Sequence, residues 1–295
     1  MAEIGSTLAR RALGRQLSKL RERAKIKQAE AARLIGVSPQ SISRMEDGLT
    51  GRVNDLFLNT LCNAYSATGE EREIILKLAE DVRTTGKKGG GWWRRYADAI
   101  PDGFDHYLAL EDAASRITAW KLAIVPGPLQ TKSYRRAVIW AETPDLSPEV
   151  VDMRLEIAAR RRARLDDPQF TMDALLSEAV IRDRIGGAGV MKEELYHLVT
   201  IGEQPNVSIR IVPFDAPGHH VGAVTNSFVL LEFPELQSTK LPEPPVVYIE
   251  SYLGAAYLEL ESEIRQYRHA ATEISRVALD SDESRRMILA AAEEM

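Results

Sequence analysis

The sequence predicts a multi-domain protein, with an all-α head of five helices followed by an α+β body that contains an antiparallel sheet. The chain of 295 residues is longer than a typical single domain. Helical spacing dominates its first part, whereas helical patterns mix with strand-like runs in its second. The stretch TTGKKGGG between them is typical of a flexible tether. We expect a head at 1–83, a flexible linker at 84–91 and a body at 92–295.

The five helices of the head follow from leucine spacing and from residues that start or stop helices. Gly36 is expected to end the second helix, because glycine readily adopts the conformation that terminates a helix. Ser38 is a favourable N-cap for the third helix, and Pro39 suits its first position. The helices are expected over about residues 8–20, 28–35, 39–46, 53–65 and 70–82.

The body combines helical periodicity with short apolar runs bounded by Pro, Gly or Asn. Its helices are expected over about residues 130–141, 148–165, 190–201, 260–277 and 282–294. Its strand-like runs are FTMDALL, NVSIRIVPF, NSFVLLEF and VVYIE. This mixture favours an antiparallel sheet covered by helices.

Charge is distributed unevenly along the chain. The net charge is −5, yet residues 1–66 contain eleven Lys and Arg against six Asp and Glu, a balance of +5. The other residues carry 27 basic and 37 acidic side chains, a balance of −10. A basic head on an acidic body predicts that only the head meets a polyanion such as nucleic acid.

Other features of the composition indicate a cytoplasmic protein without a membrane partner. The single cysteine, Cys62, cannot form an internal disulfide, which favours a reducing compartment. The stretch MAEIGSTLARRALGR lacks the apolar run of a signal peptide. No stretch is long and apolar enough to cross a bilayer.

The short third helix has two faces of different chemistry. Ile42 and Met45 share its inner side, whereas Gln40 and Arg44 point outward, one turn apart. An amide and a guanidinium match the hydrogen-bonding edges of adenine and guanine in the major groove. Two short helices joined by a tight turn form a helix-turn-helix unit, whose second helix enters that groove. A polar surface helix of an ordinary bundle is the competing interpretation.

The stretch LGRQLSKLRERAKIKQAEAARLIGVSPQSISRMEDG resembles the head of the xenobiotic-response-element (XRE) class of transcriptional regulators. The resemblance implies that Gln28 opens the second helix and contacts the DNA backbone. It also implies that Ala32 permits close helix packing and that Arg21 pairs with Glu46 as a structural clamp. Two positions depart from the pattern, because lysine replaces the usual glycine at residue 25 and the usual hydroxyl residue at 27.

The body resembles the large C-terminal, antitoxin-like domain attached to such heads in actinobacterial regulators. The matching stretches are WWRRYADAIPDGFDHYLALEDAASRI, VPGPLQTKSYRRA, NVSIRIVPF, NSFVLLEFP and PPVVYIES. This resemblance implies a regulator that is often encoded beside a small partner protein. It supplies no ligand for the body.

The sequence therefore favours a sequence-specific DNA-binding transcriptional regulator that acts as a homodimer, with a body for dimerisation and for partner or effector sensing. The alternative is an antitoxin-like protein that mainly sequesters a small partner encoded nearby, with DNA binding serving autoregulation. The candidate contacts to double-stranded DNA are Gln28, Ser38, Gln40, Ser41, Ser43, Arg44 and Arg52.

A cytoplasmic enzyme whose head merely localises it is a third hypothesis. The nucleophile-elbow and zinc-protease motifs are absent from the sequence, so no catalytic residue is expected. Adjacent His219 and His220 lack cysteines or carboxylates at ligand spacing, which is more typical of an ordinary loop than of a metal site. No cofactor and no metal are expected.

Overall fold

The computed structural model describes residues 5–49, 54–87, 91–101, 103–216, 220–251 and 254–295. The chain divides into two compact units. Unit 1 comprises residues 1–94 and 234–243, and unit 2 comprises residues 95–233 and 244–295. The N-terminal unit therefore contains a ten-residue segment from far along the chain, which no feature of the sequence predicted.

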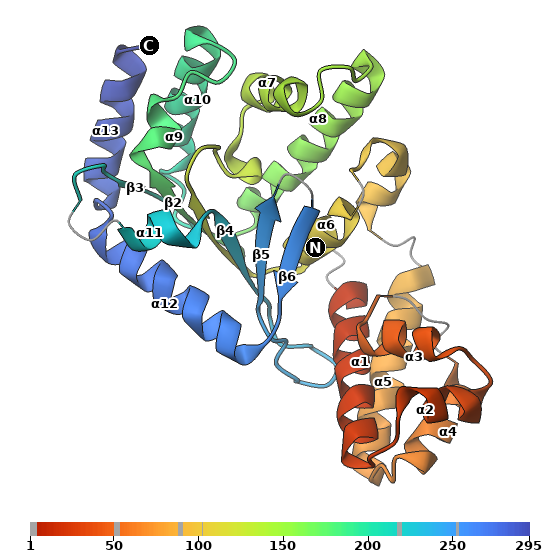
Figure 1. The fold of residues 1–295 in the computed structure, drawn as a ribbon. Helices are drawn as coiled ribbons and strands as arrows, with labels where there is room; N and C mark the ends of the chain where they lie inside the picture. The colour runs from red at the N-terminus through yellow and green to blue at the C-terminus, as the bar shows by residue number, and fades with distance from the viewer. Residues whose placement is uncertain (1–4, 50–53, 88–90, 102, 217–219, 252–253) are drawn as a thin grey trace. The chain divides into compact units, whose positions relative to one another are not determined.

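Unit 1 contains the five predicted helices. They are α1 (Gly5–Arg23), α2 (Gln28–Ile35), α3 (Pro39–Glu46), α4 (Asp55–Ala64) and α5 (Gly69–Lys87). The long helices α1 and α5 pack against each other, and α2 packs against α3 and α4 (Figure 1). The leucines whose helical spacing predicted α1 are buried in the core, together with two leucines of α4: Leu8, Leu13, Leu17, Leu20, Leu58 and Leu61.

Helix α5 is longer than the sequence indicated. It continues to Lys87, so the first four residues of the predicted flexible linker are helical. The Thr84 hydroxyl donates to the Glu80 carbonyl at 2.8 Å, which satisfies that polar side chain within the helix. Residues 88–90 of the predicted linker lie outside the described residues.

The sheet of unit 2 is mixed, which corrects the predicted antiparallel sheet. Its strands are β1 (Arg116–Lys121), β2 (Thr171–Ser177), β3 (Val207–Val212), β4 (Phe228–Glu232), β5 (Val246–Ser251) and β6 (Gly254–Leu258). They lie in the order β3-β2-β1-β4-β5-β6. The pairs β1–β2 and β2–β3 are parallel. The pairs β1–β4, β4–β5 and β5–β6 are antiparallel.

Long helical connections explain the parallel half of the sheet. Helices α7 (Lys132–Glu142) and α8 (Pro148–Arg162) lie between β1 and β2, and α9 (Glu178–Arg182) and α10 (Ala188–Ile201) lie between β2 and β3. Connections of this length return the chain to the same end of the sheet, which makes consecutive strands parallel. The sequence did not indicate β1 as a strand, so the first of these connections was not recognised.

Helices cover both faces of the sheet (Figure 1). Helices α6 (Phe104–Ala113), α7, α10 and α13 (Ser281–Glu293) contribute to the core on one face. On the other face, Trp120, Phe228 and Val247 pack with Ile264 and Ile274 of α12 (Glu261–Val277). The two faces match the two-residue alternation along each strand. No helix in the described part of the chain is long and apolar enough to span a membrane.

Candidate nucleic-acid interface

A tight turn joins α2 to α3. Gly36 has a φ of 68° and a ψ of 36°, values in the left-handed region that glycine adopts without steric penalty. The Val37 N–H donates to the Ala32 carbonyl at 3.0 Å and satisfies a carbonyl at the end of α2. The turn thus directs the chain into α3, and the two helices form the predicted helix-turn-helix unit.

The first turn of α3 is capped by a serine. The Ser38 hydroxyl accepts a hydrogen bond from the Ser41 N–H at 3.2 Å, and the two hydroxyl oxygens lie 2.9 Å apart. Pro39 takes the first helical position, where its missing N–H leaves no helical bond unmade. The predicted N-cap is confirmed. The proposed DNA contacts of the two serines stay predictions.

The inner face of α3 packs closely against α1. Ile42 is only 1% exposed. A Cβ atom added to Gly14 of α1 would lie 2.3 Å from the Glu46 carbonyl oxygen and 2.6 Å from that of Met45. Such distances are far below van der Waals contact, so only glycine permits this approach. Gly14 therefore fixes where the last turn of α3 lies relative to α1.

A polar clamp links α1, α2 and α3. The Arg21 Nε and Nη2 atoms donate to the two carboxylate oxygens of Glu46 at 2.6 Å and 2.8 Å. The Gln28 Nε2 atom donates to the same carboxylate at 2.9 Å. The hydrogen bonding of Arg21 itself to Glu46 is the main influence that raises the pKa of the Arg21 guanidinium. The clamp implied by the resemblance is confirmed, with Gln28 as an additional member.

The outer face of α3 presents side chains that the fold does not use. Gln40 and Arg44 are exposed, and neither forms a hydrogen bond or ion pair with another described residue. Ser43, by contrast, donates to the Asp47 carboxylate at 3.2 Å. On the outer face of α3, the Gln40 amide and the Arg44 guanidinium therefore keep all their hydrogen-bond donors available for a ligand.

The start of α2 offers donors for a phosphate. Lys27 occupies the N-cap position and makes no side-chain cap, as its departure from the family pattern led us to expect. The first N–H groups of α2 therefore lack a side-chain acceptor, and helix N-termini of this kind bind phosphate. Gln28 keeps a second amide hydrogen beside the one that bonds Glu46. Arg52 lies outside the described residues.

Unit 1 as a whole is basic. It carries 18 Lys and Arg against 13 Asp and Glu, a net charge of +5, and unit 2 carries −10. The charge asymmetry seen in the sequence therefore coincides with the division into units. A positive charge of this size favours contact with a polyanion.

Some cations of unit 1 form ion pairs that the sequence did not reveal. The Glu243 carboxylate accepts from the Arg11 Nε at 2.7 Å and from the Arg15 Nη1 at 2.8 Å. Arg23 forms a bidentate pair with Glu71. No local pattern could have indicated the pairing of Glu243, because its partners are more than two hundred residues away in the sequence.

Comparison with known protein families agrees with this division. A family model described as a helix-turn-helix domain matches residues 12–74. A second model, described as a domain of unknown function (DUF5753), matches residues 104–290, which is more than half of the chain. The chain belongs to the DUF5753 family. No curated protein and no solved structure matches this DUF5753 chain.

The helix-turn-helix match covers the second part of α1, all of α2 to α4 and the first part of α5, and it therefore includes the surface built by α2 and α3. Helix-turn-helix domains are DNA-binding domains of regulators. The DUF5753 match covers most of unit 2, whose function its description leaves open. Within the described residues no group of three or more His, Cys, Asp or Glu could hold a metal ion. His219 and the side chain of His220 lie outside them.

Proposed function

We propose that the protein is a sequence-specific DNA-binding transcriptional regulator of the XRE class, with α3 as the recognition helix in the major groove. The exposed and unpartnered Gln40 and Arg44 carry this proposal. Their positions on α3 are fixed by the buried Ile42 and by the cap at Ser38. A rigid helix with free base-reading side chains is the arrangement that direct readout requires.

Other residues of unit 1 position the protein on the DNA backbone. We assign phosphate contacts to the N-terminus of α2, to Gln28 and to Arg52. Ser38, Ser41 and Ser43 lie beside the base-reading pair and supply short polar contacts. Phosphate contacts of this kind set register and orientation, while base contacts set sequence preference.

The protein acts as a homodimer through unit 2. One recognition helix of eight residues offers few base contacts, and dimers of this class place two such helices on half-sites roughly 34 Å apart. The net charge of −10 makes unit 2 unsuited to DNA. We therefore assign unit 2 to dimerisation and effector sensing, without a catalytic role. Sedimentation that finds one chain per DNA site would contradict the dimer.

Substitutions at Arg44 test the recognition helix. DNA selected from a random library by the full chain provides the preferred operator. Arg44→Ala should weaken operator binding by about 1–3 kcal/mol and relax base preference at one position. Arg44→Lys keeps the charge but loses the bidentate geometry, so it should keep affinity for scrambled DNA and still lose base preference.

Two further variants separate the alternatives. Arg52→Ala should weaken binding to operator and scrambled DNA alike and reduce the salt dependence of binding, as loss of a phosphate contact does. Ile42→Asp should unfold unit 1, because it places a charge in the seam between helices. Unchanged affinity and base preference in Arg44→Ala would remove the basis of the proposal.

A further inference from the structure

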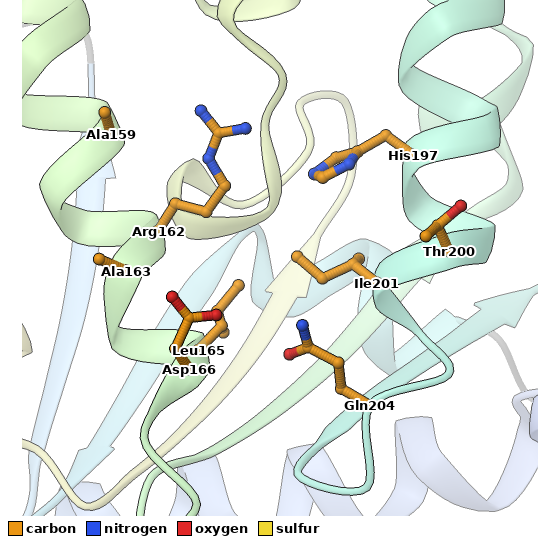
Figure 2. A pocket seen from close by; sticks show the side chains of 9 residues that line it. All are labelled: Ala159, Arg162, Ala163, Leu165, Asp166, His197, Thr200, Ile201 and Gln204. Atoms are coloured by element: carbon orange, nitrogen blue, oxygen red, sulfur yellow. The ribbon is translucent and has the colours of Figure 1, made fainter.

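A cavity of about 320 Å³ opens in unit 2 between the C-terminal end of α8 and the C-terminal end of α10 (Figure 2). Its apolar walls include Leu165 and Ile201, which are almost fully buried. Five polar side chains also line it: Arg162, Asp166, His197, Thr200 and Gln204. Its volume lies at the lower end of the range for small-molecule sites, and its mixture of apolar walls with a few polar groups is typical of them.

Two of the polar side chains hold buried acceptor atoms without a hydrogen-bond partner in the described part of the chain. His197 Nε2 and Gln204 Oε1 are shielded from solvent, and no described residue forms a hydrogen bond with either atom. His197 also has a hydrogen bond to the Leu129 backbone, and a neutral imidazole keeps a lone pair on one of its two ring nitrogens. Burial, together with the nearby Arg162, lowers the pKa of His197 and thereby favours the neutral ring. Unsatisfied buried acceptors are costly, and a ligand with N–H donors would satisfy both.

The guanidinium of Arg162 is also unused. Two nearby arginines, in contrast, have partners. Arg161 forms a buried bidentate pair with Glu111, and Arg164 donates to the Ala114 carbonyl. Within the described residues, nothing forms a hydrogen bond or ion pair with Arg162. Figure 2 shows its side chain and the His197 ring extending toward each other across the cavity. A free guanidinium in this place suits a carboxylate, which it can bind with two parallel hydrogen bonds.

We propose that this cavity binds a free α-amino acid, with its carboxylate on Arg162 and its ammonium group on His197, Gln204 and Asp166. An ammonium group has three N–H donors, and these three side chains supply one acceptor group each: the imidazole Nε2, the amide Oε1 and the Asp166 carboxylate. The apolar walls at Leu165 and Ile201 favour an aliphatic side chain. A simple acid or a simple amine would satisfy only one half of this arrangement.

Calorimetric titration of the full chain with L-alanine, L-valine and L-leucine tests the proposal. Isocaproate, which is leucine without its ammonium group, and isoamylamine, which lacks the carboxylate, are the matched ligands. We expect at least one amino acid to bind about tenfold or more tightly than either analogue. In the nitrogen NMR spectrum of the unmodified protein, the Nε2 resonance of His197 should shift on saturation. Equal binding of amino acid and analogue, or no binding at millimolar concentration, would overturn the proposal.

Three variants of the full chain locate the site. Arg162→Met and Gln204→Leu should each weaken amino-acid binding about tenfold or more. Lys132→Met is the matched control, because Lys132 is a cation that lines only the neighbouring cavity. Its binding should equal that of the unmodified chain. Circular dichroism verifies that each variant folds, and the His197 resonance gives a readout that needs no variant. Equal affinity in Arg162→Met and the unmodified chain would exclude this cavity as the site.

Discussion

Arg11 and Glu243 are joined by a hydrogen bond of 2.7 Å, although 232 residues separate them in the sequence. Both side chains are almost completely buried, with 3% and 0% exposed. Arg15 binds the same carboxylate and adds a second cation. One buried carboxylate thus binds the segment 234–243 to α1. Unit 1 therefore contains both the helix-turn-helix and a piece of the chain that follows β4.

Replacing Glu243 should destabilise unit 1. Glu243→Gln removes the carboxylate from a buried ion pair with Arg11, and breaking a buried pair on one side costs about 3–5 kcal/mol. Hydrogen exchange of the amides of α1 in the full chain measures the loss. Glu235→Gln, an exposed position on the same segment, is the control and should change nothing. Equal protection in both variants would show that the pair does not hold unit 1 together.

A methyl group at Gly14 should displace α3. Gly14→Ala places Cβ against backbone atoms of α3, and overpacking of this kind costs typically about 1–3 kcal/mol. Because α3 must move, operator affinity should fall together with the thermal stability of unit 1. Gly69→Ala is the matched control, since a Cβ there meets nothing within 4 Å. Full operator affinity in Gly14→Ala would mean that this contact does not position α3.

Lys25 should be replaceable by glycine with a gain in stability. Its φ of 58° lies in the left-handed region, where a residue with a Cβ is strained by about 1–2 kcal/mol. Part of the gain is offset by the greater freedom of glycine in the unfolded chain, about 0.4–1 kcal/mol. Lys25→Gly should therefore raise hydrogen-exchange protection in unit 1 by about 1 kcal/mol. Lys25→Ala removes the same charge but keeps the strain, and a similar gain there would point to charge instead.

Glu194 should make unit 2 less stable as pH rises. Its side chain is fully buried, and one carboxylate oxygen accepts from the Thr131 N–H at 2.7 Å. Burial raises the pKa of this carboxyl from an ordinary value of 4.5 to about 7, against the lowering effect of that hydrogen bond. The folded protein thus holds the proton more tightly than the unfolded chain does. The stabilisation is complete below about pH 4.5 and is lost as pH rises to about 7.

The loss amounts to about 3 kcal/mol in the free energy of unfolding. Glu194→Gln cannot ionise, so its urea unfolding should lack this decrease between about pH 4.5 and about pH 8. Glu193→Gln changes the exposed neighbouring residue and should keep the pH dependence of the unmodified chain. If the free energy of unfolding changed with pH in the same way in all three proteins, Glu194 would not titrate in this range.

Local signals in the sequence predicted most of the elements but not the whole sheet. The caps and the turn placed α2 and α3 with the bounds that the structure shows, because Gly36, Ser38 and Pro39 act on their immediate neighbours. The run RITAWK of β1 was not recognised, although it is the strand that joins the parallel and antiparallel halves. Strand direction depends on connections and pairing, which the residues of one strand do not encode.

The candidate sites divide in the same way. Gln40 and Arg44 were predicted because they lie one turn apart on a single helix, where spacing alone determines a shared face. The cavity between α8 and α10, which Arg162 lines, was not predicted, because residues of both helices are needed to form it. Arg161, next to Arg162 in the chain, is buried and paired with Glu111, which its sequence neighbours do not indicate. Contacts made by separate elements require the fold to be known.

The position of residues 234–243 has a consequence for the order of events during protein synthesis. The helices of unit 1 leave the ribosome first, but the segment that pairs with Arg11 and Arg15 follows only after residues 95–233 have been made. At usual translation rates this interval is on the order of ten seconds. During it the two arginines lack their carboxylate. A nascent chain therefore cannot finish its DNA-binding unit until most of its second unit has been translated.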